Sequence, residues 1–120
     1  DLRIPVLGLE AGQFRHGPFE MVGRDSAVVF LRGTGPEGDN IDGIAGECAE
    51  AGLRPIIFDF SGEPDIDGCL TVRLPVREGL AAAVSALMAV QQAIVSAASR
   101  MVANVGVPLR SKKVTSGEAR

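Results

Sequence analysis

The chain has few of the residues that mark several large classes of protein. Two cysteines, Cys48 and Cys69, occur in 120 residues, which gives no disulfide framework, and we expect two reduced thiols in a core. The net charge is only −3, which argues against binding to nucleic acid or to an anionic membrane. The start has no basic segment followed by an apolar one, so we expect no signal peptide and a cytoplasmic protein.

Long uninterrupted apolar runs are also scarce. The longest apolar stretch, residues 80–103, contains serines, two glutamines and Arg100. Together with its many alanines, these polar residues favour a buried helix over a membrane span. No internal repeat is found. A hydrophobic content of 46% in 120 residues is enough for one domain with a proper core.

The order of the apolar segments predicts an α/β fold. Residues 26–31 and 55–60 are continuous β-type runs, as in parallel strands covered on both faces. We expect a third strand over 70–74, a helix over 40–51 that ends at Gly52, and a long helix from Leu80. Residues 4–9 should be extended, and residues 13–22 should form a loop with a short helix. Short connections between these elements favour a mostly parallel sheet sandwiched by helices.

The single histidine, His16, is the first candidate for chemistry. Imidazole has an ordinary pKa near 6.5, so it both accepts and donates protons under cell conditions. Gly17 and Pro18 follow it, and proline fixes its own φ and moves the preceding residue away from helical geometry. The segment therefore predicts an imidazole held by a stiff elbow, with Arg15 beside it as an anion partner. A purely structural histidine is the alternative.

Two other segments invite a functional interpretation. Residues 33–38 read GTGPEG, a G-x-G-x-x-G pattern, and Asp59 ends the next strand where a dinucleotide fold places its ribose-binding acid. Pro36, a helix start expected near Asn40 and acidic residues at that start favour a plain loop instead. In the basic tail, Lys112 and Lys113 either lie in solvent or reach into a site, where a lysine holds an anion or attacks a carbonyl.

Residues 13–20 (QFRHGPFE) resemble the E-F-R/K-H-G-P-x-E signature of the sugar isomerase (SIS) domain, as in the isomerase part of glucosamine-6-phosphate synthase. Residues 108–115 (PLRSKKVT) are similar to that family's P-R-x-L-x-K-V-T ending. The resemblance implies a three-layer, flavodoxin-like SIS sandwich over residues 1–106 and a tail over 107–120. The family's enolising glutamate and its Ser/Thr-rich phosphate loop are not found here. We therefore expect a domain incomplete at its N-terminus and inactive by itself.

The resemblance also implies roles for individual residues. His16 would open the sugar ring, from the neighbouring subunit of a homodimer. Lys113, or Lys112 if the tail is shifted by one residue, would form a Schiff base with the open-chain sugar. Arg15 and Gln13 would contact the substrate. Isomerisation or deamination of a hexose 6-phosphate is the implied reaction, with no cofactor, metal, nucleic acid or membrane.

Two alternatives stay open at this point. A SIS module without catalysis would sense a phosphosugar, and replacing His16 would then leave ligand affinity intact. A nucleotide-binding domain would use the glycine-rich segment, and titration with NAD(H) would reveal it.

Overall fold

The computed structural model describes residues 4–105 and residue 107. The chain divides into two compact units, and the larger one, Leu7–Val90, contains the sheet and most of the helices. The smaller unit takes in residues 4–6 and the chain from Gln91 onward.

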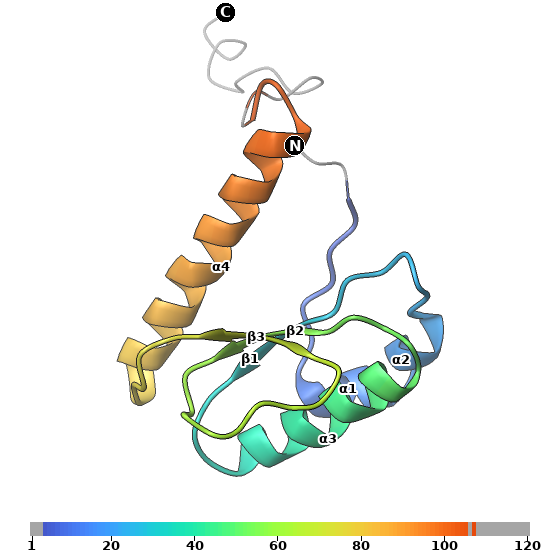
Figure 1. Cartoon of the computed structure of the whole chain (residues 1–120), viewed down its shortest axis with the longest axis vertical. Coiled ribbons are helices and arrows are strands. Elements are labelled where there is room, and N and C mark those ends of the chain that lie inside the picture. Colours follow the sequence, from blue (N-terminus) through green and yellow to red (C-terminus); the bar gives the residue numbers. More distant parts are fainter. Residues whose placement is uncertain (1–3, 106, 108–120) are drawn as a thin grey trace, which may run out of the picture. The chain divides into compact units, whose positions relative to one another are not determined.

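The elements of the larger unit follow the predicted α/β order (Figure 1). Two short helices, α1 (Ala11–Arg15) and α2 (Pro18–Met21), precede strand β1 (Val29–Arg32), helix α3 (Pro36–Glu50), strand β2 (Ile56–Asp59) and strand β3 (Leu70–Arg73). Helix α4 (Gly79–Met101) begins in this unit and continues into the smaller one. Residues 4–10 form neither helix nor strand.

The sheet is three-stranded, in the order β1-β2-β3, and both pairings are parallel. Helix α3 connects β1 with β2, as is usual for parallel neighbours. The second connection, residues 60–69, contains no helix at all. The parallel sheet is as predicted from the sequence, and all three predicted strands lie within a few residues of the observed bounds.

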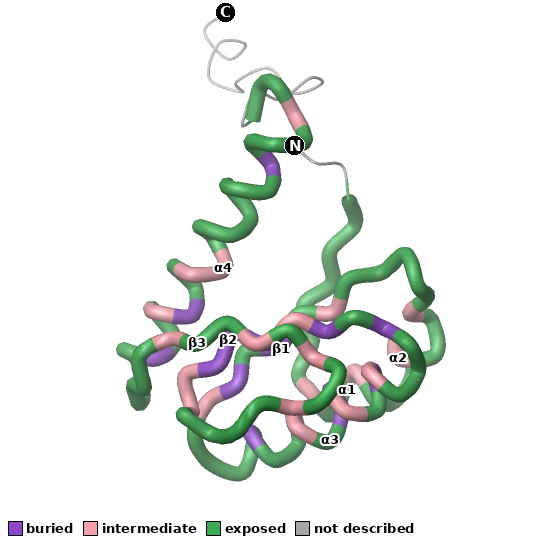
Figure 2. The backbone as a smooth tube through the Cα atoms, in the orientation of Figure 1, coloured by how far each residue is buried: buried purple, intermediate pink, exposed green. Residues whose placement is uncertain are grey.

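The two faces of the sheet differ in what covers them. The register aligns Phe30 with Ile57, and both are buried on the face that packs against α3. Val29, Leu31, Leu70 and Val72 lie on the opposite face and keep a third or more of their surface exposed. Figure 2 shows the contrast between buried and exposed positions along the strands. The prediction that these strands are covered on both faces is therefore met on the α3 face and only in part on the other, where Phe58 of the central strand is buried.

The core lies between the sheet and α3. Its buried members come from β1, β2, α3 and the turn after α3: Phe30, Ile44, Ala45, Cys48, Leu53 and Ile57. Phe14 of α1 and Phe19 of α2 pack against this cluster. The core thus extends beneath both short helices and fixes them to the domain.

Helix α3 begins four residues earlier than the predicted start at Asn40. Proline suits the first helical position, where its missing N–H would have no partner, and Pro36 occupies that position here. Gly35 precedes it with φ of +100°, which glycine tolerates best. The loop expected over 33–39 is therefore only a short turn. The other end is as predicted: the helix stops at Glu50, and Gly52 adopts φ +80° just beyond it.

Helix α4 corrects another expectation, because it is not the buried core helix that its composition predicted. Only 11% of its most apolar 18-residue window is buried, and among the described residues it is the one helix long and apolar enough to cross a membrane. In the part of α4 that belongs to the larger unit, the buried residues are two alanines, Ala82 and Ala86. Three short strands offer too little surface to cover a helix that is apolar nearly all round.

Candidate functional site

His16 lies at the apex of the turn between α1 and α2, and its side chain is exposed. It caps the C-terminus of α1, and Gly17 follows with φ of +154°, outside the helical region. Pro18 then starts α2 as its first residue. The stiff elbow predicted from the sequence is present, and it directs the chain so that the imidazole stands outside the core.

Aromatic packing on both sides of the turn holds His16 in place. Phe14 lies two residues before it and Phe19 three residues after it. Their ring centroids are 5.6 Å apart in an edge-on arrangement, and Phe14 also meets Phe30 of β1 at 6.4 Å. Such pairs contribute about 0.5–1.5 kcal/mol beyond the area that they bury. The two phenyl rings thus anchor the turn to the core, while His16 at its tip stays accessible.

Arg15 is already engaged in this structure. Its Nη2 atom lies 2.6 Å from Oε1 of Glu47 in α3, and both side chains are a little under half exposed. This ion pair ties α1 to the last turn of α3. Since an exposed pair is worth at most about 1 kcal/mol, an anionic ligand would have to share Arg15 with Glu47 or displace it. The predicted substrate contact of Arg15 stays a prediction.

Of the remaining predicted site residues, Gln13 lies three residues before His16, within α1, and makes a local contact. The Oε1 atom of Gln13 accepts a hydrogen bond from the backbone N–H of Glu10 at 3.4 Å, which closes the start of α1. Lys112 and Lys113 lie outside the described residues. Within those residues, no group of three or more histidine, cysteine or acidic side chains could hold a metal ion.

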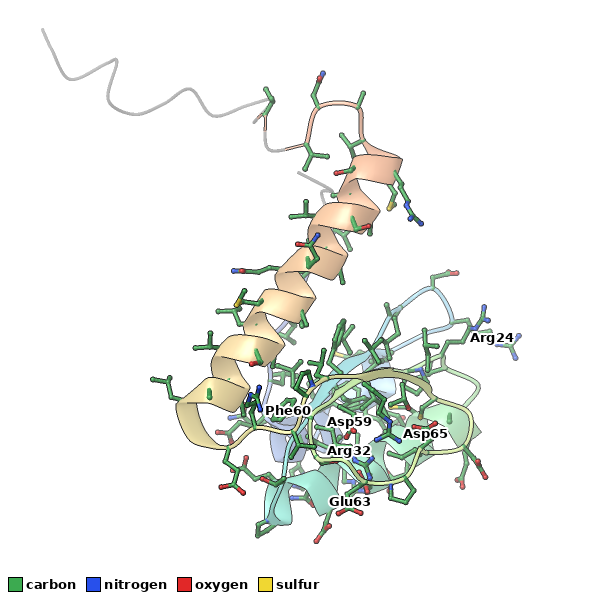
Figure 3. All side chains as sticks on the ribbon, turned by 60° about the vertical axis from the view of Figure 1, so that its left-hand side comes forward. Arg24, Arg32, Asp59, Phe60, Glu63 and Asp65 are labelled. Carbon is green, nitrogen blue, oxygen red and sulfur yellow. The ribbon has the colours of Figure 1, made fainter. Side chains whose placement is uncertain are left out.

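A row of charges at the carboxyl ends of the strands escaped the sequence analysis. Arg32, Asp59 and Arg73 are the last residues of β1, β2 and β3, and the register places them side by side. Asp59 is 0% exposed and Arg32 is 3% exposed. The carboxylate of Asp59 lies 3.5 Å from Nη1 of Arg32 and 2.5 Å from Nη1 of Arg73. Figure 3 shows Arg32 and Asp59 together on the α3 side of the sheet.

Further contacts complete this row. Ser61 Oγ donates to Asp59 at 2.6 Å, and Arg32 also pairs with Asp42 of α3 at 2.5 Å. Burial alone would raise the pKa of Asp59, but the hydrogen bonds from Ser61 and Arg73 and the charge of Arg73 lower it overall. Desolvation alone would lower the pKa of Arg32, but its hydrogen bond to Asp42 and the negative charges around it, led by Asp42, raise it overall.

This arrangement bears on one sequence hypothesis. An aspartate that binds a ribose must present its carboxylate to the ligand, whereas both oxygens of Asp59 are occupied by Ser61 and the two arginines. The structure therefore argues against the ribose-binding role considered for Asp59. The signal that could have been noticed is that a charged residue, Arg32, Asp59 or Arg73, lies within one residue of each predicted strand end.

The glycine-rich turn follows the same edge of the sheet. A Cβ atom on Gly38 would lie 2.7 Å from the carbonyl oxygen of Gly33, and one on Gly33 would lie 2.7 Å from the ring of Phe60. Both glycines therefore serve close packing of α3 and Phe60 against the turn. A packing role accounts for the pattern without any bound phosphate.

Both cysteines are free thiols, as expected. Burial raises the pKa of Cys48 to about 11, with smaller contributions from Cys69 and Glu47. Burial also raises the pKa of the half-buried Cys69. A thiol with a raised pKa carries little thiolate at neutral pH, so neither cysteine is suited to be a nucleophile.

In comparisons with protein families, with curated proteins and with solved structures, no match to this chain was found.

Proposed function

We propose that this chain supplies the ring-opening histidine of a SIS-type phosphosugar isomerase or deaminase. The observation that supports it best is the state of His16: the chain's single imidazole is exposed at the tip of a turn that Pro18 stiffens and that Phe14 and Phe19 anchor. An imidazole kept for packing would be buried and bonded to the core. An exposed imidazole at the tip of an anchored turn is suited to enter a site formed largely by another chain.

The chemistry assigned to His16 is a proton transfer between two oxygens of a cyclic hexose 6-phosphate. The neutral ring takes the proton from the anomeric hydroxyl while the bond between C1 and the ring oxygen breaks. The same proton is then returned to the former ring oxygen, which leaves an aldehyde at C1 and a free hydroxyl at C5. No net proton is consumed, so a base that works near neutral pH is sufficient.

The remaining assignments rest on the resemblance in residues 13–20 and 108–115. Lys113, with Lys112 as the alternative, would form a Schiff base with the open-chain sugar. Arg15 and Gln13 would contact the substrate, and the site would be shared between the subunits of a cytoplasmic homodimer. The three-layer SIS sandwich belongs to the same proposal, and the observed parallel sheet with α3 on one face is compatible with it.

The sharpest test isolates ring opening from the later steps. Exchange between the α and β anomers of glucose 6-phosphate requires ring opening only, and NMR exchange spectroscopy measures its rate. Because the enolising glutamate and the phosphate loop are not found in this sequence, we expect the chain alone to complete no isomerisation. We expect it to accelerate only this first step, and the His16→Ala variant to leave the exchange at the buffer rate. Met21→Ala, at an exposed position on α2, is the matched control and should behave as the wild type.

The outcome also separates the enzyme from a phosphosugar sensor. Because His16 is the only histidine, its two carbon-bound ring protons give the only imidazole signals in the spectrum. A sensor would bind the sugar phosphate with equal affinity in the wild type and in His16→Ala, without faster anomer exchange. If hexose 6-phosphates neither shift the His16 signals nor exchange faster than in buffer, the proposed function is wrong.

A further inference from the structure

A cavity of about 450 Å³ lies within the larger unit, at the carboxyl ends of β1 and β2. The edge where parallel strands end is where ligands bind in open α/β sheets. Its volume is within the usual range for small-molecule sites, about 300–1,000 Å³. The cavity is separate from the His16 turn. It is bordered by Glu37 and Gly38 in the first turn of α3, whereas Arg15 beside His16 pairs with Glu47 in the last turn.

Most of the residues that line the cavity are apolar. They include Leu31, Ile41 and Phe60, and the first part of α4 contributes Ala82, Ala83, Ala86, Leu87 and Val90. Figure 3 shows Phe60 between Asp59 and the start of α4. A lining that combines alanine methyl groups with a phenyl ring is suited to a flat apolar group, because aromatic surfaces stack closely only on flat neighbours.

The glycine turn leaves the space that the ring of Phe60 occupies. A side chain on Gly33 would overlap the ring, since its Cβ would lie 2.7 Å from Phe60 Cε2. The glycine therefore lets the ring line the cavity. This gives the G-x-G-x-x-G segment a role in shaping an apolar pocket.

The charged residues that line the cavity are mainly of one sign. Glu37 and Glu78 contribute two carboxylates, against the one guanidinium of Arg77, and Thr34 adds a hydroxyl. The positive end of the α3 dipole is also met by acidic groups, Glu37 and Asp39, in its first turn. Carboxylates in the lining repel a phosphate or carboxylate ligand and attract a cation.

We propose that this cavity binds a small aromatic amine. The flat aromatic body lies between Phe60 and the alanines of α4, and the protonated amine lies beside Glu37 and Glu78. The site is additional to the sugar-phosphate site proposed at His16 and does not depend on it.

The chain offers a direct fluorescence test, because it contains neither tryptophan nor tyrosine. The indole emission of tryptamine therefore reports the ligand alone. We expect tryptamine emission to change and saturate on titration with the full chain. Indole-3-propionate has a similar ring but a negative charge. We expect its affinity to be lower than that of tryptamine by about tenfold or more, since one charge contact near a protein surface is worth that much.

Two alanine variants test the location. Ala83→Leu adds a side chain inside the cavity at a position already exposed to solvent, so it should fold normally and abolish tryptamine binding. Ala81→Leu makes the same change on the same helix at an exposed residue that does not line the cavity, and it should bind as the wild type does. Melting curves of both variants verify that they are folded.

Glu78→Gln tests the charge. It should reduce tryptamine affinity toward that of uncharged indole and leave indole binding unchanged. Absence of saturable tryptamine binding overturns the proposal, as does an equal loss of binding in the two leucine variants. Tighter binding of indole-3-propionate or of ADP than of tryptamine also overturns it, and in the case of ADP would favour the nucleotide-binding alternative.

Discussion

At the scale of single residues, the feature that dominates is the alternating row Arg32, Asp59 and Arg73. Burying a charge is tolerated only when partners and hydrogen bonds replace its water. Asp59 meets this condition with two arginines and Ser61. The carboxylate is the shared member of the row, so its loss leaves the deeply buried Arg32 with a weaker set of partners.

Replacing Asp59 therefore has a large expected cost. Asp59→Asn should lower the free energy of unfolding by about 3–5 kcal/mol, because it removes one of the two carboxylates that pair with the buried Arg32. Asp65→Asn is the matched control. Asp65 also pairs with Arg73 at 2.5 Å, but its side chain is 68% exposed, so its loss should cost under about 1 kcal/mol. Urea unfolding measures both, and equal effects would contradict a special role for the buried row.

The two thiols should differ in their accessibility to reagents. Cys48 is fully buried with a pKa near 11, whereas Cys69 is only partly buried. We expect Ellman's reagent to modify one thiol slowly in the native chain and the second only on addition of urea. The Cys69→Ser variant should abolish the native phase and keep the other. A native phase that survives in this variant would mean that Cys48 is accessible.

At the scale of elements, α3 shows where a sequence pattern decides a structure and where it does not. Its end was predicted, because Gly52 at φ +80° allows the carbonyl of Cys48 to accept from Leu53 N–H at 3.0 Å. Its start was misplaced, because Gly35 and Gly38 favour a loop by propensity. The fixed φ of Pro36 and the close contact of Gly38 with Gly33 outweigh that propensity.

Two glycines with similar φ allow the cost of overpacking to be measured separately from the cost of a left-handed backbone. Gly52 (φ +80°) has nothing near its Cβ position, so Gly52→Ala should cost only the left-handed backbone penalty of about 1 kcal/mol. At Gly68 (φ +78°), an added Cβ would lie 2.8 Å from the Cβ of Ala49. Gly68→Ala should therefore cost more, about 2–4 kcal/mol, since overpacking is added. Chemical denaturation measures the difference, and equal costs would contradict the observed packing.

At the scale of the whole molecule, apolar surface outside the core is extensive. It includes the outer face of the sheet at Val29, Leu31 and Leu70, and exposed apolar residues along α4 such as Val84 and Met88. Monomeric proteins rarely leave apolar patches of such extent in water. The proposed homodimer is one way in which this surface is covered.

Self-association is therefore expected in solution. At micromolar concentration the chain should sediment as a dimer, and Met88→Glu should shift it toward the monomer, since Met88 is 64% exposed and its replacement brings a charge into a covered surface. Met21→Glu, at an exposed residue of α2, is the control. A wild-type monomer at this concentration would contradict the expectation.

The sequence analysis predicted the class of fold and the character of the His16 turn, because both depend on local patterns. Continuous apolar runs indicate parallel strands, and Gly17 with Pro18 specifies an elbow. The charge row and the cavity depend on residues far apart in sequence that only the register of the strands brings together. The exposure of α4 was missed for a related reason, since composition reports how apolar a helix is and not how much surface is available to cover it.

The connection from β2 to β3 makes the edge of the sheet sensitive to acid. Residues 60–69 cross over without a helix, and this loop is held by Arg32 at the carbonyl of Pro64 and by Arg73 at the carbonyl of Glu63. Both arginines are oriented by Asp59. Its pKa is lowered in the folded chain, so the stability that it contributes is present above the unfolded pKa, near 3.9, and is lost as pH falls through the folded value.

Acidification should consequently detach β3 before the rest of the domain unfolds. Amide hydrogen exchange should quicken first at Thr71 and Val72, while Ile44 and Cys48 of α3 stay protected. Uniform exchange across the domain would contradict this order. Where β3 leaves, β2 acquires an unpaired edge, and such an edge is a template for pairing with other chains. An acidic environment would thus turn one protonation event into a route to fibrous aggregates.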